Sequence, residues 1–316
     1  MYEFKNPVMF ESVFTLNDNQ IFPNLCVMGE EPQIVPPANS EPGIVYHYCN
    51  NNAFTGILEN ECFWLSSLFY TNDEMESSYF FNLFNNYVQK YQINQEWADF
   101  FIKMKNHFRI NIDEAFSVSF SNQRDDKNQW ILYSDDCQGY SIGIDTTQLT
   151  LTRGLPQRLY AGMVPDCCTA FLKINYDVIF HEAQIEKLLT KMFEEKFPIS
   201  DICHFLSKLA FVFKSDWYKT ENEYRILYTP GMPEVLGDMP GGIDSSNGFI
   251  SERRKRKNKI SDNVSYFCYS FEKSLIKEIG IGPKNNISIE QVKSLLIEMG
   301  YDTNNINIYK SRGAYR

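Results

Sequence analysis

The segment "ENEYRILY", residues 221–228, alternates charged and apolar side chains with a period of two. Successive side chains of a strand point to opposite faces of a sheet. The pattern therefore predicts a strand with Glu221, Glu223 and Arg225 on one face. Its other face is largely apolar and suited to a core, and consists of Asn222, Tyr224, Ile226 and Tyr228.

The two carboxylates on the charged face raise the main functional question. Like charges two residues apart on one face repel each other unless a cation or a polar ligand lies between them. Arg225 can neutralise one of them. One interpretation is a solvent-facing strand whose Glu–Arg contact adds little stability. The other is a functional site, because perturbed carboxylates gather at such sites.

Short strand and helix patterns alternate irregularly along the chain, which indicates the α+β class. We expect one irregular N-terminal segment (1–42) and a single α+β domain (43–316) with a mobile loop at 231–262, where Gly, Pro, Ser and charge are dense. The chain has no Gly-rich phosphate-binding loop of the dinucleotide or P-loop type. Strands are expected at 43–48, 62–67, 115–121, 129–134 and 139–145, and helices at 51–60 and 181–210.

Composition narrows the functional classes. The 316 residues carry a net charge of −10, which argues against a broad nucleic-acid surface. If the substrate is a nucleic acid, the run "RRKRK", Arg253 to Lys257, is the one place where its phosphates would be met. Eight cysteines without a CxxC pair and four histidines without metal-ligand spacing argue against a zinc enzyme.

The chain contains no apolar run near the roughly 20 residues of a membrane span. Its N-terminus carries acidic residues and does not read as a signal peptide. We therefore expect a soluble, cytoplasmic protein without a membrane partner.

Three blocks in order carry a family resemblance. They are "YHYCNNNAFTGILENECFWLSSLFYTNDEMES", "FSVSFSNQRDDKNQWILYSDDCQGYSIGID" and "WYKTENEYRI", followed by "IKEIGIGP". Together they resemble the bacterial family catalogued as domain of unknown function 2971, over roughly residues 43–283. This resemblance does not by itself imply an activity.

A second resemblance is to ADP-ribosyltransferase-like folds, including the DNA-modifying toxin group. The strand with His47, the Ser-x-Ser of "FSVSFS" and the Glu-x-Glu of residues 221–223 occur in the chain order of that fold. The resemblance implies a split mixed β-sheet core flanked by helices, with NAD as the substrate. It also implies an ADP-ribosyltransferase or NAD glycohydrolase, in a toxin or phage-defence setting, with an unknown protein or nucleic-acid acceptor.

The two resemblances, together with the chemistry of the side chains, imply expected roles for individual residues. Glu223 would stabilise the cationic, oxocarbenium-like transition state, and Glu221 would orient or deprotonate the acceptor. Arg225 would keep one carboxylate ionised or meet a phosphate. The expected NAD-contacting residues are Tyr46, His47, Ser119, Ser121, Asn72, Asp73, Trp130 and Tyr133.

Each assignment has an ordinary structural alternative. His47 can be a buried strand histidine satisfied by a backbone group, and Asn72 or Asp73 can cap a helix. The serines can belong to an ordinary strand, and the aromatic residues to the core. Two other functions stay open at this point: a non-catalytic ligand-sensing or interaction module, and a metal-dependent nuclease that uses Asp73, Glu76 and Glu223.

Overall fold

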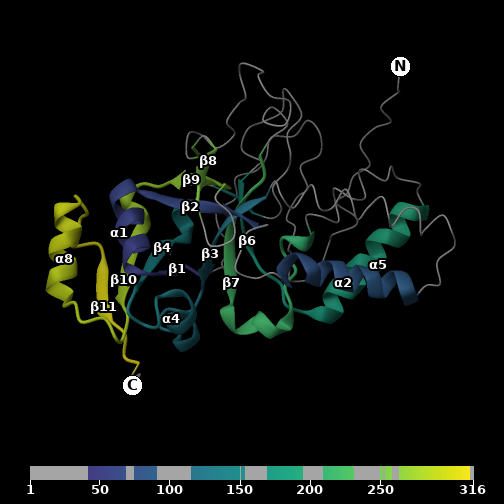
Figure 1. Cartoon of the computed structure of the whole chain (residues 1–316), viewed down its shortest axis with the longest axis horizontal. Coiled ribbons are helices and arrows are strands. Elements are labelled where there is room, and N and C mark those ends of the chain that lie inside the picture. Colours follow the sequence, from purple (N-terminus) through teal and green to yellow (C-terminus); the bar gives the residue numbers. More distant parts are fainter. Residues whose placement is uncertain are drawn as a thin grey trace, which may run out of the picture.

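The structure is a computed structural model (Figure 1). It describes residues 42–68, 75–90, 115–149, 151–153, 169–194, 209–230, 250–251, 253–257 and 263–313. The expected N-terminal segment, Asn72, Asp73 and most of the loop at 231–262 lie outside these residues.

The described residues form both helices and strands, as expected for the α+β class. The helices are α1 (Asn51–Asn60), α2 (Met75–Lys90), α4 (Lys127–Tyr133), α5 (Val178–Glu194) and α8 (Ile289–Glu298), with 3-10 turns η3 (Thr146–Gln148), η5 (Asp216–Glu221) and η6 (Lys273–Leu275). The strands are β1 (Ile44–Cys49), β2 (Cys62–Ser67), β3 (Phe116–Ser121), β4 (Tyr140–Asp145), β5 (Thr152–Arg153), β6 (Thr169–Lys173), β7 (Glu223–Tyr228), β8 (Arg254–Arg256), β9 (Val264–Ser270), β10 (Ile276–Ile281) and β11 (Asn307–Lys310).

The strands belong to one mixed sheet. Its main path runs β11-β10-β4-β1-β3-β2-β9-β8, while β7 pairs with β3 and β6, and β6 also pairs with β5. The β10–β11 and β5–β6 pairs are parallel, and the other described pairs are antiparallel. A mixed sheet flanked by helices confirms the predicted α+β class.

Strand β3 is the branch point of the sheet. Along one edge it pairs with β7 over all six of its residues, from Phe116 to Ser121. Along its other edge it pairs with β1 only at Ser121 and with β2 only at Phe116 and Ser117. Strands β1 and β2 therefore diverge beside the middle of β3, and Ser119 lies between the two contacts.

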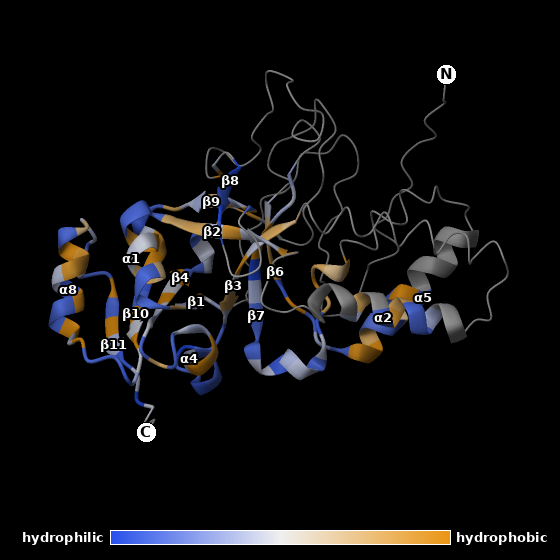
Figure 2. Cartoon of the chain, in the orientation of Figure 1, coloured by the Kyte–Doolittle hydropathy of each residue, from blue (hydrophilic) through white to orange (hydrophobic). Residues whose placement is uncertain are grey.

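The two faces of the sheet have different environments. One face carries the main hydrophobic core, which α1 and α8 cover with Phe54, Leu58, Val292 and Leu296. The apolar stripe of α8 and its polar opposite side are visible in Figure 2. On the other face, α4 places Trp130 against Tyr46 and Tyr48 of β1, together with Cys137.

Helix α4 corrects the strand expected at 129–134. Asp126 caps the helix by accepting hydrogen bonds from the backbone N–H groups of Asn128 and Gln129. A short apolar run such as "QWILY" fits a strand or a helix equally well, and the cap decides for the helix. The chain then turns through Asp135, Asp136 and Cys137, which all have positive φ, into β4.

Helices α2 and α5 pack against each other to one side of the sheet (Figure 1). Their described contact centres on His181, a fully buried residue of α5. The ring donates from Nε2 to the Asn175 carbonyl oxygen (3.0 Å), so Nδ1 accepts from the Tyr79 hydroxyl (2.9 Å). It also stacks on Phe213 at 4.1 Å between ring centres. A neutral imidazole thus satisfies both of its nitrogens.

Two more expectations change with the structure. The strand expected from Glu221 begins at Glu223, because Glu221 ends the turn η5 and Asn222 adopts a left-handed conformation with φ 44°. The basic run at 253–257 is not wholly a loop, since Arg254–Arg256 forms β8 along β9. Among the described helices, none combines the length and apolar character needed to cross a bilayer.

Candidate functional site

Four charged side chains lie buried together where β7 begins. Lys214, Glu221, Glu223 and Arg225 have between 2% and 9% of their surface exposed. Lys214 Nζ lies 2.7 Å from Glu221 Oε2 and 3.2 Å from Glu223 Oε2. The lysine is therefore the cation between the two carboxylates. We call these four residues the ionic cluster.

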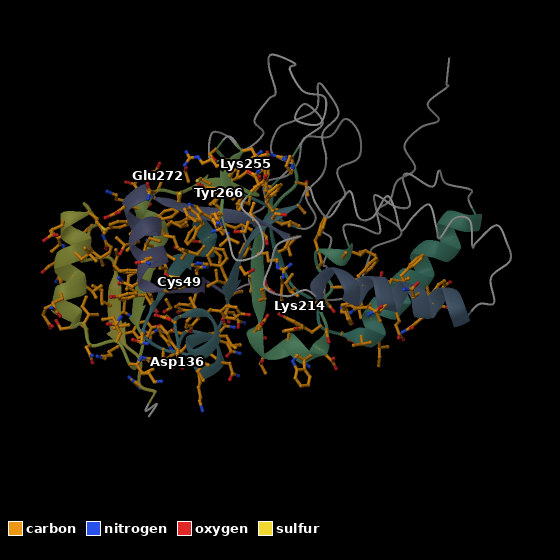
Figure 3. All side chains as sticks on the ribbon, viewed as in Figure 1. Cys49, Asp136, Lys214, Lys255, Tyr266 and Glu272 are labelled. Atoms are coloured by element: carbon orange, nitrogen blue, oxygen red, sulfur yellow. The ribbon has the colours of Figure 1, made fainter. Side chains whose placement is uncertain are left out.

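The local backbone brings the two glutamates to one lysine. Ser215 caps η5, and Asn222 ends it in the left-handed conformation, which asparagine tolerates better than most residues. Glu221 therefore reaches Lys214 from the turn, while Glu223 reaches it from the first residue of β7. Figure 3 shows Lys214 beside β7, on the side toward α2.

Arg225 holds Glu223 through a two-pronged contact. Arg225 Nε donates to Glu223 Oε1 at 2.6 Å, and Nη2 donates to Oε2 at 3.0 Å. The third nitrogen, Nη1, donates to the Phe211 carbonyl oxygen at 3.4 Å. Such bidentate, charge-assisted contacts fix both partners in orientation. The expected pairing of Arg225 with one carboxylate is confirmed, whereas the solvent-facing interpretation is wrong, because the pair is buried.

The Glu223 carboxylate is ionised at neutral pH in spite of its burial. Burial raises the pKa of this carboxyl group, but the charges of Arg225 and Lys214 and hydrogen bonds from Arg225 and Ser119 outweigh it. Together they lower the pKa of Glu223 from 4.5 to about 2. The Glu223 charge is therefore held away from bulk water, beside the two cations that stabilise it.

Glu221 is held by different partners. The Tyr133 hydroxyl of α4 donates to Glu221 Oε1 at 2.6 Å, and Lys214 holds Oε2. Burial and the neighbouring Glu221 charge raise the pKa of Tyr133 well above its usual range. Tyr133 therefore donates a hydrogen bond to Glu221, the residue that is expected to orient the acceptor.

Ser119 is the exposed member of the site. It pairs directly with Arg225 across the β3–β7 ladder, so its side chain shares a face with Arg225 and Glu223. Although β3 is an interior strand, Ser119 is exposed, whereas Ser117 and Ser121 on the same strand are buried. Ser119 is therefore an exposed residue next to the buried ionic cluster, where β1 and β2 diverge.

His47, on β1, contacts the backbone of Ser119 on the neighbouring strand β3. Its Nδ1 lies 2.9 Å from the Ser119 carbonyl oxygen, so Nδ1 carries the proton and donates it to that oxygen. Burial lowers the pKa of His47 below 6.5. Its ring packs against Phe63 and Phe120, which lie on the sheet face opposite Glu223. Ser119 thus contacts His47 through its backbone and Glu223 through its side chain.

Three other expected residues make contacts within the protein. The Tyr46 hydroxyl donates to Glu278 Oε2 at 3.1 Å, and the Ser121 hydroxyl donates to the Glu221 carbonyl oxygen at 2.7 Å. The Trp130 indole N–H donates to Asp125 at 2.7 Å, and the ring is 2% exposed. These contacts position β1, β3 and α4, and the Trp130 ring belongs to the core rather than to an open stacking surface.

A metal centre finds no support among the described residues, where no group of three His, Cys, Asp or Glu side chains has suitable geometry. Glu223, which the nuclease hypothesis requires, already binds two cationic side chains with its two oxygens. Asp73 and the side chain of Glu76 lie outside the described residues.

Sequence reasoning missed two residues of the site. Lys214 ends the apolar run "LAFVFK", and a lone lysine at such a position was the available signal. Tyr176 accepts a hydrogen bond from the backbone N–H of Glu223 at 3.2 Å, and no local pattern marks it. Both come from segments before β7 that the chain folds back against it.

No protein family, no curated protein and no solved structure matches the chain.

Proposed function

We propose that the protein binds NAD beside Ser119 and acts on it as an ADP-ribosyltransferase or NAD glycohydrolase. The observation that carries the proposal is the Glu223 carboxylate, buried and held ionised directly beneath an exposed serine. A preorganised negative charge is the group that stabilises a cationic transition state at a ribose carbon.

The contacts of Glu223 indicate how a ribose would reach it. Two donors of Arg225 and one of Lys214 occupy the carboxylate from the interior. The Ser119 hydroxyl is its neighbour on the exposed side. A ribose hydroxyl would displace the Ser119 hydroxyl or bind to it, and so meet the charge of Glu223. Glu221, held by Tyr133 and Lys214, would act on the acceptor.

The decisive assay is nicotinamide release from NAD by the wild type and by Glu223→Gln, with candidate acceptors present and absent. We expect a loss of about a hundredfold or more, the usual effect of removing one preorganised electrostatic group. Because Glu223 neutralises buried cations, Glu223→Gln is also expected to lower stability, so rates are compared well below its unfolding temperature.

Matched variants separate the roles of the residues. Ser119→Ala should weaken turnover, whereas Ser117→Ala, on the same face of the same strand, should not. Glu221→Gln should lower transfer to an acceptor while hydrolysis by water partly survives. A wild type that releases no nicotinamide and is not stabilised by NAD in a thermal melt contradicts the proposal.

A second function has its own supporting observation. The ionic cluster contains two cations and two anions, so its field at the surface is smaller than that of a lone carboxylate. This balance favours a non-catalytic ligand-binding module. Such a module would bind NAD without releasing nicotinamide, and its affinity would survive Glu221→Gln.

A further inference from the structure

Strands β2, β9 and β8 place aromatic and cationic side chains on one face at the end of the sheet. Tyr266 of β9 pairs with Arg254 of β8 and with Ser66 of β2. Directly paired residues share a face, and so do residues two positions apart on a strand. Trp64 and Arg256 therefore lie on this face too. We call Trp64, Tyr266, Arg254 and Arg256 the aromatic–arginine face.

The side chains of this face are already arranged as a stack. The Trp64 and Tyr266 ring centres are 4.8 Å apart. The Arg256 guanidinium lies over both rings, 4.9 Å from the Trp64 centre and 5.7 Å from the Tyr266 centre. Arg256 also donates to the Ser66 hydroxyl at 2.8 Å. These contacts orient Arg256 and the indole before any ligand arrives.

The stack remains open to solvent. Trp64 is 47% exposed, which is unusual for so large an apolar side chain on a strand of the main sheet path. Arg254 is exposed and Arg256 is partly exposed. Figure 3 shows Lys255 and Tyr266 near each other at the upper edge of the view, away from Lys214.

The charge of this face is opposite to that of the whole chain. Five consecutive basic residues, 253–257, occur in a protein whose net charge is −10. The described members of the face include no acidic side chain. The middle residues of the run form the edge strand β8, and strand geometry sends alternate side chains to opposite faces. Arg254 and Arg256 are thereby directed to the side of Trp64.

We propose that the aromatic–arginine face binds single-stranded nucleic acid, with a base stacked on Trp64 and phosphates held by Arg254 and Arg256. Exposed aromatic rings beside arginines are the elements by which proteins hold unpaired bases and their backbone. An acidic peptide would use the arginines but has no need of the indole. A duplex hides the flat surfaces of its bases, so it would leave Trp64 without a partner.

The location of this face relative to the ionic cluster adds a second point. Ser66 pairs with Ser117 of β3, so the aromatic–arginine face is continuous with the face that carries Ser119 and Arg225. A single-stranded nucleic acid bound over Trp64 would run along the side of the sheet on which Ser119 is exposed. The binding proposal does not depend on NAD chemistry and is tested without NAD.

The experiment measures fluorescence anisotropy of a labelled 20-nucleotide oligo(dT) with the full chain at low salt. Trp64→Leu should weaken binding by roughly 5- to 100-fold, the range for loss of one stacked base. Its matched control is Trp217→Leu, which removes a tryptophan that is 84% exposed on η5 and should leave the affinity unchanged.

The arginines are tested by the dependence of affinity on salt. Arg254→Gln combined with Arg256→Gln should reduce the slope of log K against log salt by about 1.4, or 0.7 for each lost phosphate contact on a single strand. The control combines Lys293→Gln and Arg312→Gln, which are exposed near the opposite end of the sheet. Because Arg254 is exposed, Arg254→Gln alone gives a variant whose folding is not at risk.

Three results would overturn the proposal: no binding of oligo(dT) at low salt, equal affinity for duplex DNA of the same length, or equal affinity for poly-glutamate. Retention of wild-type affinity by folded Trp64→Leu would also overturn it, since binding would then be a general attraction between charges. Thermal melts of each variant confirm that lost binding is not lost folding.

Discussion

The ionic cluster and the His181 contact are two ways of burying titratable side chains, and they follow opposite rules. In the ionic cluster, burial acts against ionisation, yet Lys214 and Arg225 keep Glu223 charged and lower its pKa to about 2. At His181, burial also acts against the charged form, and it prevails, lowering the pKa from 6.5 to about 4. Opposite charge within hydrogen-bond distance is what separates the two outcomes.

The comparison shows what each site is suited to do. A neutral histidine whose nitrogens are both satisfied joins α2 to α5 and needs no charge for that purpose. The ionic cluster carries four charges where an apolar core of similar volume is often as stable or more stable. Such a cluster is weak evidence for stability, which strengthens the case that it serves a function beside Ser119.

The largest expected effect comes from breaking the balance of the ionic cluster. Lys214→Met should destabilise the protein by about 3–5 kcal/mol, because it leaves two buried carboxylates with one arginine. Urea unfolding measures the change, with Lys219→Met on the exposed side of η5 as the control. A loss below 1 kcal/mol would show that Lys214 does not neutralise both glutamates.

The second expected effect is a dependence of stability on pH that comes from His181. Because the folded pKa of His181 is about 4 and its ordinary value is 6.5, the unfolded chain binds more protons between these values. The contribution of His181 to the free energy of unfolding is fully present above pH 6.5 and is lost as the pH falls toward 4. A difference of 2.5 in pKa corresponds to a loss of at most about 3 kcal/mol. The measurement is urea unfolding at a series of pH values.

The His181 contribution is isolated by substitution. His181→Gln lacks the titrating group, so the step between pH 6.5 and pH 4 should disappear from its stability profile. Asp177 and Asp216, whose charges raise the pKa of His181, remain in both proteins. An unchanged step in the variant would assign the pH dependence to other groups.

The smallest effect comes from an ion pair near solvent. Arg124 Nε lies 2.6 Å from Glu278 Oε2, and the Arg124 side chain is 47% exposed. Solvent screens this pair, so Arg124→Gln should cost less than about 1 kcal/mol, and less again at high salt. Unfolding at two salt concentrations tests this. A cost similar to that of Lys214→Met would contradict the prediction that burial makes the Lys214 contacts worth more than the exposed Arg124–Glu278 pair.

The sheet was more predictable than the site because alternation is a local signal. The strands expected at 43–48 and 139–145 are found within one residue, as Ile44–Cys49 and Tyr140–Asp145, and the strand expected at 221–228 is found from Glu223 to Tyr228. The error at 129–134 arose because six residues are too few to separate the helical period from the strand period. The Asp126 cap, three residues before "QW", was the signal that favoured a helix.

The side chains of the ionic cluster all lie within residues 214–225, but no local periodicity marks which of them contact each other. The sequence identified Glu221, Glu223 and Arg225, but it did not show that Lys214 lies between the carboxylates or that Tyr133 donates to Glu221. Tyr133 lies 88 residues before Glu221, so no local pattern joins the two. The serines illustrate the same limit, since Ser119 and Ser121 share a face, yet one is exposed and the other buried.

The order of strands in the sheet also has a consequence for biosynthesis. Strand β2 pairs with β9, and β4 pairs with β10, so ladders formed early in the sequence are completed by residues 264–281. A ribosome-bound chain that has not reached Val264 presents these strands with free hydrogen-bonding edges, which invite pairing with other chains. Such non-local closure slows folding. During translation, these two edges therefore stay unpaired until residues 264–281 have emerged.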